Sequence, residues 1–218
     1  MRLQDLWKTT ATFALALTVA ACSDGAPTGP GSQSGSASAT LTDDPNTASG
    51  SLQPSFSLAS TDHSGSASYS GHMEADVKVQ VSADGQAWTD VNEQAASNSR
   101  VDFHSSSETT VASNASVDAG TYSHVRVVME NTSATIDSGS SFGASTGGLT
   151  LSADVNLTVG SDGRVVIEKQ VGDFEISADS NTTITVDLNS DTWVNQDNVE
   201  ARAVSSSEIE SATAVSVN

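Results

Sequence analysis

Apolar and polar residues alternate with a period of two over much of the chain after residue 53. In residues 149–159 every odd position is apolar and every even position is polar, and residues 77–81 and 184–188 repeat the pattern. Such alternation is typical of strands with one face on a core and one face in water. No stretch after the first two dozen residues has a 3.6-residue period long enough to predict a helix. The pattern predicts an all-β fold, an antiparallel β-sandwich of the immunoglobulin-like or Greek-key type.

Two segments predict hairpins with similar turns. Residues 77–88 and 155–166 share their apolar positions and carry an Asp-Gly pair at the same offset. Asp-Gly favours a tight turn because glycine adopts positive φ at no steric cost. The likeness has two interpretations, an internal duplication or the same turn chemistry used twice.

A third segment predicts a corner at the start of one strand. Asp118, Gly120 and Tyr122 precede an apolar run and resemble the tyrosine corner of immunoglobulin-like domains, in which the phenol bonds back to the backbone. His124 stands where those domains have a cysteine, so a true immunoglobulin domain is not supported. We predict a structural corner at these three residues.

The first residues are typical of an export signal. Arg2 and Lys8 precede a short apolar run, and small residues lead to Cys22, the single cysteine of the chain. The run is too short to span a bilayer stably. The four residues ending at Cys22 resemble a bacterial lipoprotein signal, which implies that residues 1–21 are removed and that Cys22 carries the lipid. Whether the anchor lies in the inner or the outer membrane stays open.

Composition divides the rest of the chain. Residues 22–52 are rich in Ser, Gly, Thr and Pro, with little to bury, and predict a disordered tether behind the lipidated cysteine. Residues 53–218 hold the alternating segments and are long enough for one core, so we predict a single β-sandwich domain there.

Charge limits the partners. The chain has 27 acidic and 8 basic residues and a net charge of −19. Binding nucleic acid needs a cationic face, so we expect no nucleic-acid partner, and adsorption to anionic headgroups is disfavoured for the same reason. The acids are consistent with a salt-adapted surface, with cation sites or with simple solubility.

One acidic string has oxygen ligands at alternate positions, as a calcium loop requires. Asp187, Asn189 and Asp191 are followed by Asp197, and calcium is the one cofactor that this set suggests. Thr192 and Asn198 occupy the positions where an EF-hand has glycine and glutamate, which rules against that motif. The alternative interpretation is a solvated turn between strands.

No catalytic constellation is evident. The four histidines have no metal-binding spacing, and two overlapping Gly-x-Ser-x-Gly strings within residues 139–147 run into a predicted strand, whereas a nucleophile elbow leads into a helix. We therefore expect a protein that is not an enzyme.

Residues from about 75 to 195 resemble a known family. The alternating segment 77–81 with Trp88, the Gly-Thr-Tyr-x-x-x-Arg stretch at residues 120–126, and a later strand set are similar to the family catalogued as domain of unknown function 4382. The resemblance implies a secreted or lipid-bearing β-sandwich-like protein and no settled activity. The family typically opens with Leu-Thr-Asp, letters that recur at residues 41–43 ahead of a Ser-rich insert.

Together these observations predict an exported cell-envelope protein, held at the membrane by its lipid, with a non-catalytic structural or binding domain. A surface protein or a glycan is the expected class of partner. The alternative is a calcium-dependent surface ligand- or glycan-binding module. An exported hydrolase would need a pocket with a serine or paired carboxylates, and no candidate stands out.

Overall fold

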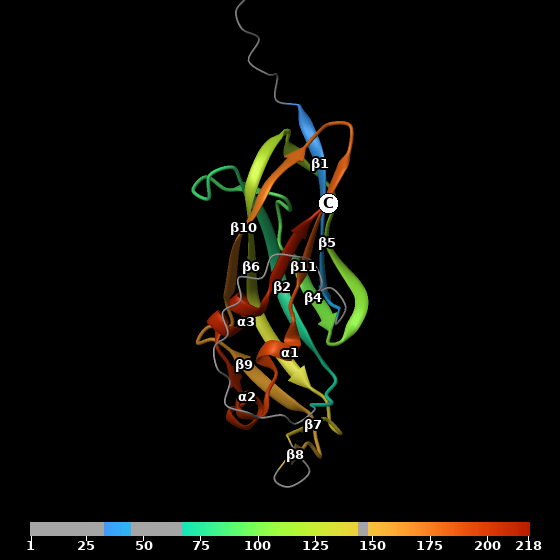
Figure 1. The fold of residues 1–218 in the computed structure, drawn as a ribbon, viewed down its shortest axis with the longest axis vertical. Helices are drawn as coiled ribbons and strands as arrows, with labels where there is room; N and C mark the ends of the chain where they lie inside the picture. The colour runs from blue at the N-terminus through green and yellow to red at the C-terminus, as the bar shows by residue number, and fades with distance from the viewer. Residues whose placement is uncertain (1–32, 45–66, 144–147) are drawn as a thin grey trace, which may run out of the picture. The chain divides into compact units, whose positions relative to one another are not determined.

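The computed structural model describes residues 33–44, 67–143 and 148–218. This part of the chain is built mostly of strands, arranged as in Figure 1. One sheet has four strands in the order β13 (Ala214–Val217), β11 (Asn181–Asp187), β1 (Ser34–Asp43) and β5 (Ser105–Asp118). The larger sheet runs β12 (Ala203–Val204), β9 (Val155–Val159), β6 (Gly120–Ile136), β2 (Gly71–Ser82) and β3 (Thr89–Asp90), with β10 (Val165–Ile176) paired to β6 and β4 (Ala96–Asp102) paired to β2. The predicted all-β, sandwich-like class is confirmed.

The two sheets bury one common core. The larger sheet contributes the inward residues of β2, β6 and β10, while the four-stranded sheet contributes small and branched residues of β1 and β11. The alternation predicted at residues 77–81 is confirmed, because Val77, Val79 and Val81 are fully buried and the polar residues between them are not. In residues 184–188 the apolar positions are fully buried as predicted, but Asp187, which was expected to face water, is buried as well. Burial of the apolar side chains stabilises the fold by about 25 cal/mol per Å² of apolar surface removed from water.

The predicted tether was wrong over β1. Ser34–Asp43 lies between β11 and β5, within the range that composition assigned to the tether. Its inward positions are Gly35, Ala37, Ala39 and Leu41, so inward and outward residues alternate along the strand. Most of these inward side chains are too small to be recognised in the sequence as a hydrophobic pattern. Small residues are needed there, since a Cβ on Gly35 would lie 2.5 Å from Ile176 Cγ2. The rest of the predicted leader and tether, residues 1–32 and 45–52, lies outside the described residues.

Most of the described strand pairs are antiparallel, as predicted, but two are parallel. β1 pairs with β11 in parallel, from Ser36 opposite Asn181 to Thr42 opposite Asp187, and β9 pairs with β12 in parallel. Parallel neighbours cannot be joined by a hairpin, and in each of these pairs the two strands lie far apart in sequence.

Neither predicted hairpin has the tight Asp-Gly turn. β2 pairs with β3, but β3 begins at Thr89, beyond the predicted residues 77–88, and residues 83–88 connect the two strands. Gly85, within this connection, has φ 74°. β9 and β10 flank a turn with Gly163 at φ 68°, yet both pair with β6 rather than with each other. β6 changes partner beside Asn131, which has φ 53°, so the two strands follow each other along one edge of β6.

The alternating run of residues 149–159 is not one strand. β8 (Leu149–Thr150) pairs with β7 (Ser141–Phe142), and the chain bends before β9 begins. Leu151 is held there because its N–H donates to Ser140 O and its carbonyl accepts from the Gly139 N–H.

Three short helices follow β11: α1 (Ser190–Trp193), α2 (Gln196–Ala201) and α3 (Ser206–Ala212). Each is too short to show a helical period in the sequence. α3 begins with a capping box, in which Ser205 and Glu208 satisfy each other's backbone N–H groups. Within the described ranges, none of these helices has the length and hydropathy that crossing a membrane requires.

Candidate functional site

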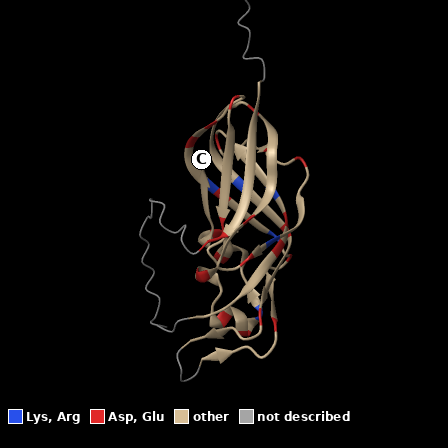
Figure 2. Cartoon of the chain, turned by 90° about the vertical axis from the view of Figure 1, so that its right-hand side faces the viewer, with Lys and Arg blue, Asp and Glu red and all other residues tan. Residues whose placement is uncertain are grey.

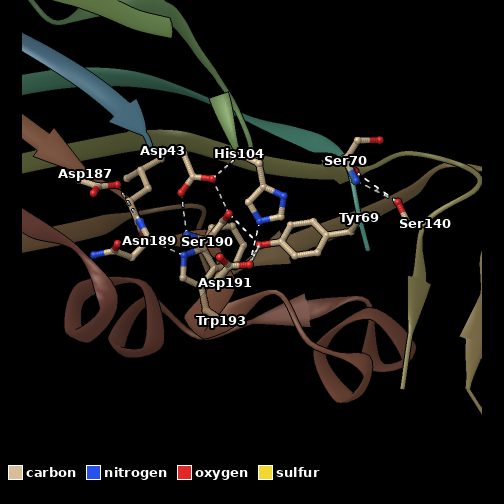
Figure 3. A network of polar contacts seen from close by, with 11 residues as sticks. Asp43, Tyr69, Ser70, His104, Ser140, Asp187, Asn189, Ser190, Asp191 and Trp193 are labelled. Atoms are coloured by element: carbon tan, nitrogen blue, oxygen red, sulfur yellow. Dashed lines mark hydrogen bonds and ion pairs between the residues drawn. The ribbon is translucent and has the colours of Figure 1, made fainter. Parts of the chain in front are cut away.

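A buried carboxylate organises the polar groups where β1 ends. Asp43 is 3% exposed. Its Oδ1 accepts a hydrogen bond from the backbone N–H of Ser190 at 2.7 Å. Its Oδ2 accepts from the Ser190 hydroxyl at 2.5 Å and from the backbone N–H of His104 at 2.8 Å. Figure 3 shows that these donors approach Asp43 from the turn between β4 and β5 and from the start of α1. Three segments far apart in sequence therefore converge on one side chain.

Tyr69 extends the arrangement. Its hydroxyl lies 2.8 Å from Ser190 Oγ and 3.1 Å from Asp191 Oδ1. Since Ser190 gives its one hydroxyl proton to Asp43, the Tyr69 proton is left for Ser190 Oγ or Asp191. Burial raises the pKa of Tyr69 well above its ordinary value, with Asp191 and Asp43 adding to the rise. Tyr69 is therefore a hydrogen-bond donor at any physiological pH.

His104 forms the solvent-facing side of this arrangement. Its Nε2 lies 2.8 Å from Asp191 Oδ1, and its ring centroid is 4.3 Å from that of Tyr69. The Asp191 side chain is 67% exposed, so this pair faces solvent while Asp43 and Ser190 do not. We call Asp43, Tyr69, His104, Ser190 and Asp191 the Asp43 network.

Aromatic rings pack around the network. Tyr69 stacks on Phe142 of β7 at 5.7 Å and meets Phe103 edge-on, and Phe103 meets Trp193 edge-on at 5.3 Å. Trp193 is fully buried and its Nε1–H donates to Leu188 O. This apolar shell excludes water and so strengthens each bond within it.

The geometry does not resemble that of an activated nucleophile. A catalytic serine needs a base hydrogen-bonded to its hydroxyl and a path for substrate. The hydroxyl of Ser190 does donate to a carboxylate, that of Asp43, but Ser190 is 1% exposed and so lacks a path for substrate. The nearby histidine bonds to Asp191 and not to Ser190. The arrangement fits a structural clasp that joins β1, the β4–β5 turn, the chain ahead of β2 and α1.

The residues predicted to bind calcium make separate contacts. Asp187 accepts the Asn189 N–H, Asn189 Nδ2 donates to Ala212 O beyond α3, and Asp191 turns toward Tyr69 and His104. Asp197 is exposed on α2. Among the described residues no three His, Cys, Asp or Glu side chains lie close enough to hold a metal ion. α1 begins at Ser190, so a helix starts within the predicted string.

The corner residues lie together. Tyr122 donates its hydroxyl to the Asp118 carbonyl oxygen at 2.7 Å, across the turn from β5 to β6 at Gly120. The ring stacks on Phe174 of β10 at 5.9 Å, and burial, followed by the charge of Asp118, raises the pKa of Tyr122. This bond back to the backbone links the two sheets where the chain crosses between them. Cys22, the predicted lipidation site, lies outside the described residues.

Comparison with known proteins identifies the domain. The family model described as domain of unknown function (DUF4382) matches residues 34–202. The chain belongs to this family. The DUF4382 match begins at the first residue of β1, which agrees with the structure in placing the start of the domain ahead of the Ser-rich insert. No curated protein and no solved structure matches the chain.

Sequence analysis missed most of the Asp43 network. Asp43 was noticed within the Leu-Thr-Asp opening typical of DUF4382 proteins, but no role followed from it. Tyr69 and Ser190 are separated from one another by 121 positions, and nothing local to either predicts the contact. The one available signal was an acidic residue directly after an alternating run of small residues.

Proposed function

We propose that this DUF4382 protein is exported, anchored to the cell envelope by lipid at Cys22, and acts there as a non-catalytic binding domain. The observation that carries the proposal is the leader: Arg2 and Lys8, a short apolar run, and small residues directly before the single cysteine. Several acyl chains on one residue give stable membrane attachment, at about 0.8 kcal/mol per buried methylene.

The position of β1 supports the anchoring part of the proposal. Because the domain begins at Ser34, only residues 23–33 separate Cys22 from the first strand. Such a segment spans at most about 40 Å when fully extended. An anchor at Cys22 would therefore keep the start of β1 within that distance of the membrane.

The interior supports the non-catalytic part. The cluster of Ser, His, Asp and Tyr in the Asp43 network bonds to itself, and its serine is buried. The proposed binding role would therefore use side chains on the surface of the domain.

The test of anchoring is metabolic labelling of the full chain with an alkyne-bearing fatty acid in a bacterial host. We expect label on the wild-type chain and recovery in the membrane fraction. The Cys22→Ser variant should be unlabelled and leave the membrane fraction. An unlabelled wild-type chain, or a Cys22→Ser variant that stays membrane-bound, would overturn the proposal.

A further inference from the structure

The outer face of the larger sheet carries a row of polar side chains across four strands. Glu168 of β10 stands opposite Arg126 of β6, Arg126 opposite Gln80 of β2, and Gln80 opposite Asp90 of β3. Directly opposite residues share one face of a sheet. Val125 and Val127, on either side of Arg126, point to the core, so the row faces away from the four-stranded sheet.

The members of this row are fixed by their neighbours. Arg126 Nε lies 2.7 Å from Glu168 Oε1. Gln80 Nε2 donates to Asp90 Oδ1 at 2.7 Å, and Lys78 Nζ lies 2.8 Å from Asp90 Oδ2. Side chains held in this way lose little conformational entropy when they bind a ligand.

An aromatic ring lies over the row. The Arg126 guanidinium carbon is 4.0 Å from the centroid of the Trp88 ring, and Trp88 directly precedes β3. Trp88 is half-buried, unlike Trp193, which is fully buried in the core. Half-exposed Val128 and Val166 stand in register beside Lys78 and enlarge the apolar part of this surface. We call Lys78, Gln80, Trp88, Asp90, Arg126 and Glu168 the Trp88 face.

Charge distinguishes the Trp88 face from the rest of the molecule. Two basic and two acidic side chains cancel there, whereas the chain as a whole carries −19. Figure 2 shows few Lys and Arg positions, most of them on strands, while the more numerous Asp and Glu are spread over strands, turns and helices. A locally neutral surface does not attract a polyanion, and its cations are already paired.

We propose that the Trp88 face binds a neutral carbohydrate. Sugar rings offer an apolar C–H face, which packs on an exposed aromatic ring, and hydroxyl groups, which both donate and accept. The part of the half-buried Trp88 ring that Arg126 does not cover supplies the apolar contact. The side chains of Arg126 and Gln80 supply fixed donors and an acceptor beside it. The inference rests on the proposed binding role and names its ligand class, but it does not depend on lipid at Cys22.

The experiment is affinity electrophoresis of the full chain, purified in detergent, through native gels that contain one polysaccharide each. The neutral probes are a glucan, a galactan, a mannan and a xylan, with polygalacturonate as the anionic comparison. We expect retardation by at least one neutral probe and none by polygalacturonate. The Trp88→Ala and Arg126→Ala variants should each bind about tenfold more weakly, the loss expected when one aromatic contact is removed.

Arg164→Ala is the matched control. Arg164 also pairs with a glutamate of the same sheet, Glu130, but it makes no contact with Trp88. It should bind like the wild type. If thermal unfolding shows that Trp88→Ala is not folded, Trp88→Phe replaces it. The quenching of tryptophan fluorescence by the probe must then be lost in Trp88→Phe.

Two results would overturn the inference. One is the absence of retardation by every neutral probe. The other is retardation that Trp88→Ala or Arg126→Ala leaves unchanged, or that Arg164→Ala reduces equally. Since fatty-acid labelling at Cys22 is measured separately, a failure here is distinguishable from a failure of the anchoring proposal.

Discussion

At the scale of single residues, Asp43 shows how backbone and hydroxyl donors can accommodate a buried carboxyl group. Two backbone N–H groups and one hydroxyl donate to it, and charge-assisted bonds of this kind are stronger than neutral ones. Ser190 supplies two of the three donors. The network therefore depends on Ser190 more than on its exposed members, His104 and Asp191.

The Ser190→Ala variant tests this dependence. Removing the hydroxyl leaves Asp43 with one donor fewer and Tyr69 with one partner fewer inside the apolar shell, so we expect the free energy of unfolding to fall by about 1–3 kcal/mol. Chemical denaturation measures it. Ser211→Ala, which removes an exposed hydroxyl bonded to Glu208 O, is the control and should change the stability by less than about 0.5 kcal/mol. Equal effects of the two substitutions would contradict the assigned role of Ser190.

A second residue-scale prediction concerns pH. The hydrogen bond from Lys78 is the largest influence on Asp90 and, with that from Gln80, lowers the pKa of Asp90 below its ordinary 3.8. Because the folded pKa is the lower one, this pairing stabilises the fold above about pH 4 and the stabilisation is lost as pH falls through the lowered pKa. In Lys78→Met the pKa of Asp90 should return toward 3.8, as measured by NMR titration of the carboxyl carbon. A pKa that does not move would show that Lys78 does not hold this carboxylate.

The Asp43 network could not be predicted because its members meet only through the fold. Asp118 and Tyr122 could be related from sequence, since their bond spans four residues. Asp43 and Ser190 are 147 residues apart. Asp187, Asn189 and Asp191 were related by their alternate spacing alone, and that spacing does not record that α1 begins among them.

At the scale of elements, the strands built from branched residues were predictable and those built from small residues were not. β2 and β11 alternate valine or isoleucine with polar residues, and alternation of that kind survives in any fold that buries one face. β1 alternates glycine and alanine with serine, which composition alone equates with a linker. The pairing of β9 and β10 with β6 depends on a change of partner within β6, and no turn signal records it.

Gly35→Ala tests whether β1 needs its small residues. A Cβ at Gly35 would lie 2.5 Å from Ile176 Cγ2 and 2.9 Å from Ser177 O, so overpacking should lower the free energy of unfolding by about 1–3 kcal/mol. Gly120→Ala is the control, because the nearest heavy atom to a Cβ there is Tyr122 Cε2 at 3.9 Å. Urea denaturation of both variants gives the comparison. A Gly35→Ala variant as stable as Gly120→Ala would argue against close packing at β1.

At the scale of the whole molecule, the domain begins at β1 and its sheets share one core. A chain of residues 33–218 should keep its near-ultraviolet circular dichroism and unfold cooperatively. A chain of residues 45–218 lacks β1, which separates β5 from β11, so it should lose both properties. Cooperative unfolding of residues 45–218 would mean that the domain does not need β1.

The net charge of −19 predicts a response of the whole fold to salt. Self-repulsion of the acids opposes the compact state, and salt screens it over a Debye length of about 10 Å at 0.1 M. The unfolding midpoint should rise as sodium chloride is raised from about 0.1 M to 1 M. Differential scanning calorimetry measures it. A midpoint that falls or stays level would show that repulsion among the acids is already balanced.

The place of β1 also sets an order of events in folding. It is the first strand of the domain to be synthesised, yet its parallel partner β11 lies 145 residues later along the chain, as the bond between Ser36 and Asn181 records. Contacts of such long sequence separation form slowly, because a large loop must close before they are made. One edge of the N-terminal strand can pair as soon as β5 exists, but its other edge has to wait for β11, when nearly the whole chain has been made. A chain interrupted before β11 therefore cannot complete its smaller sheet.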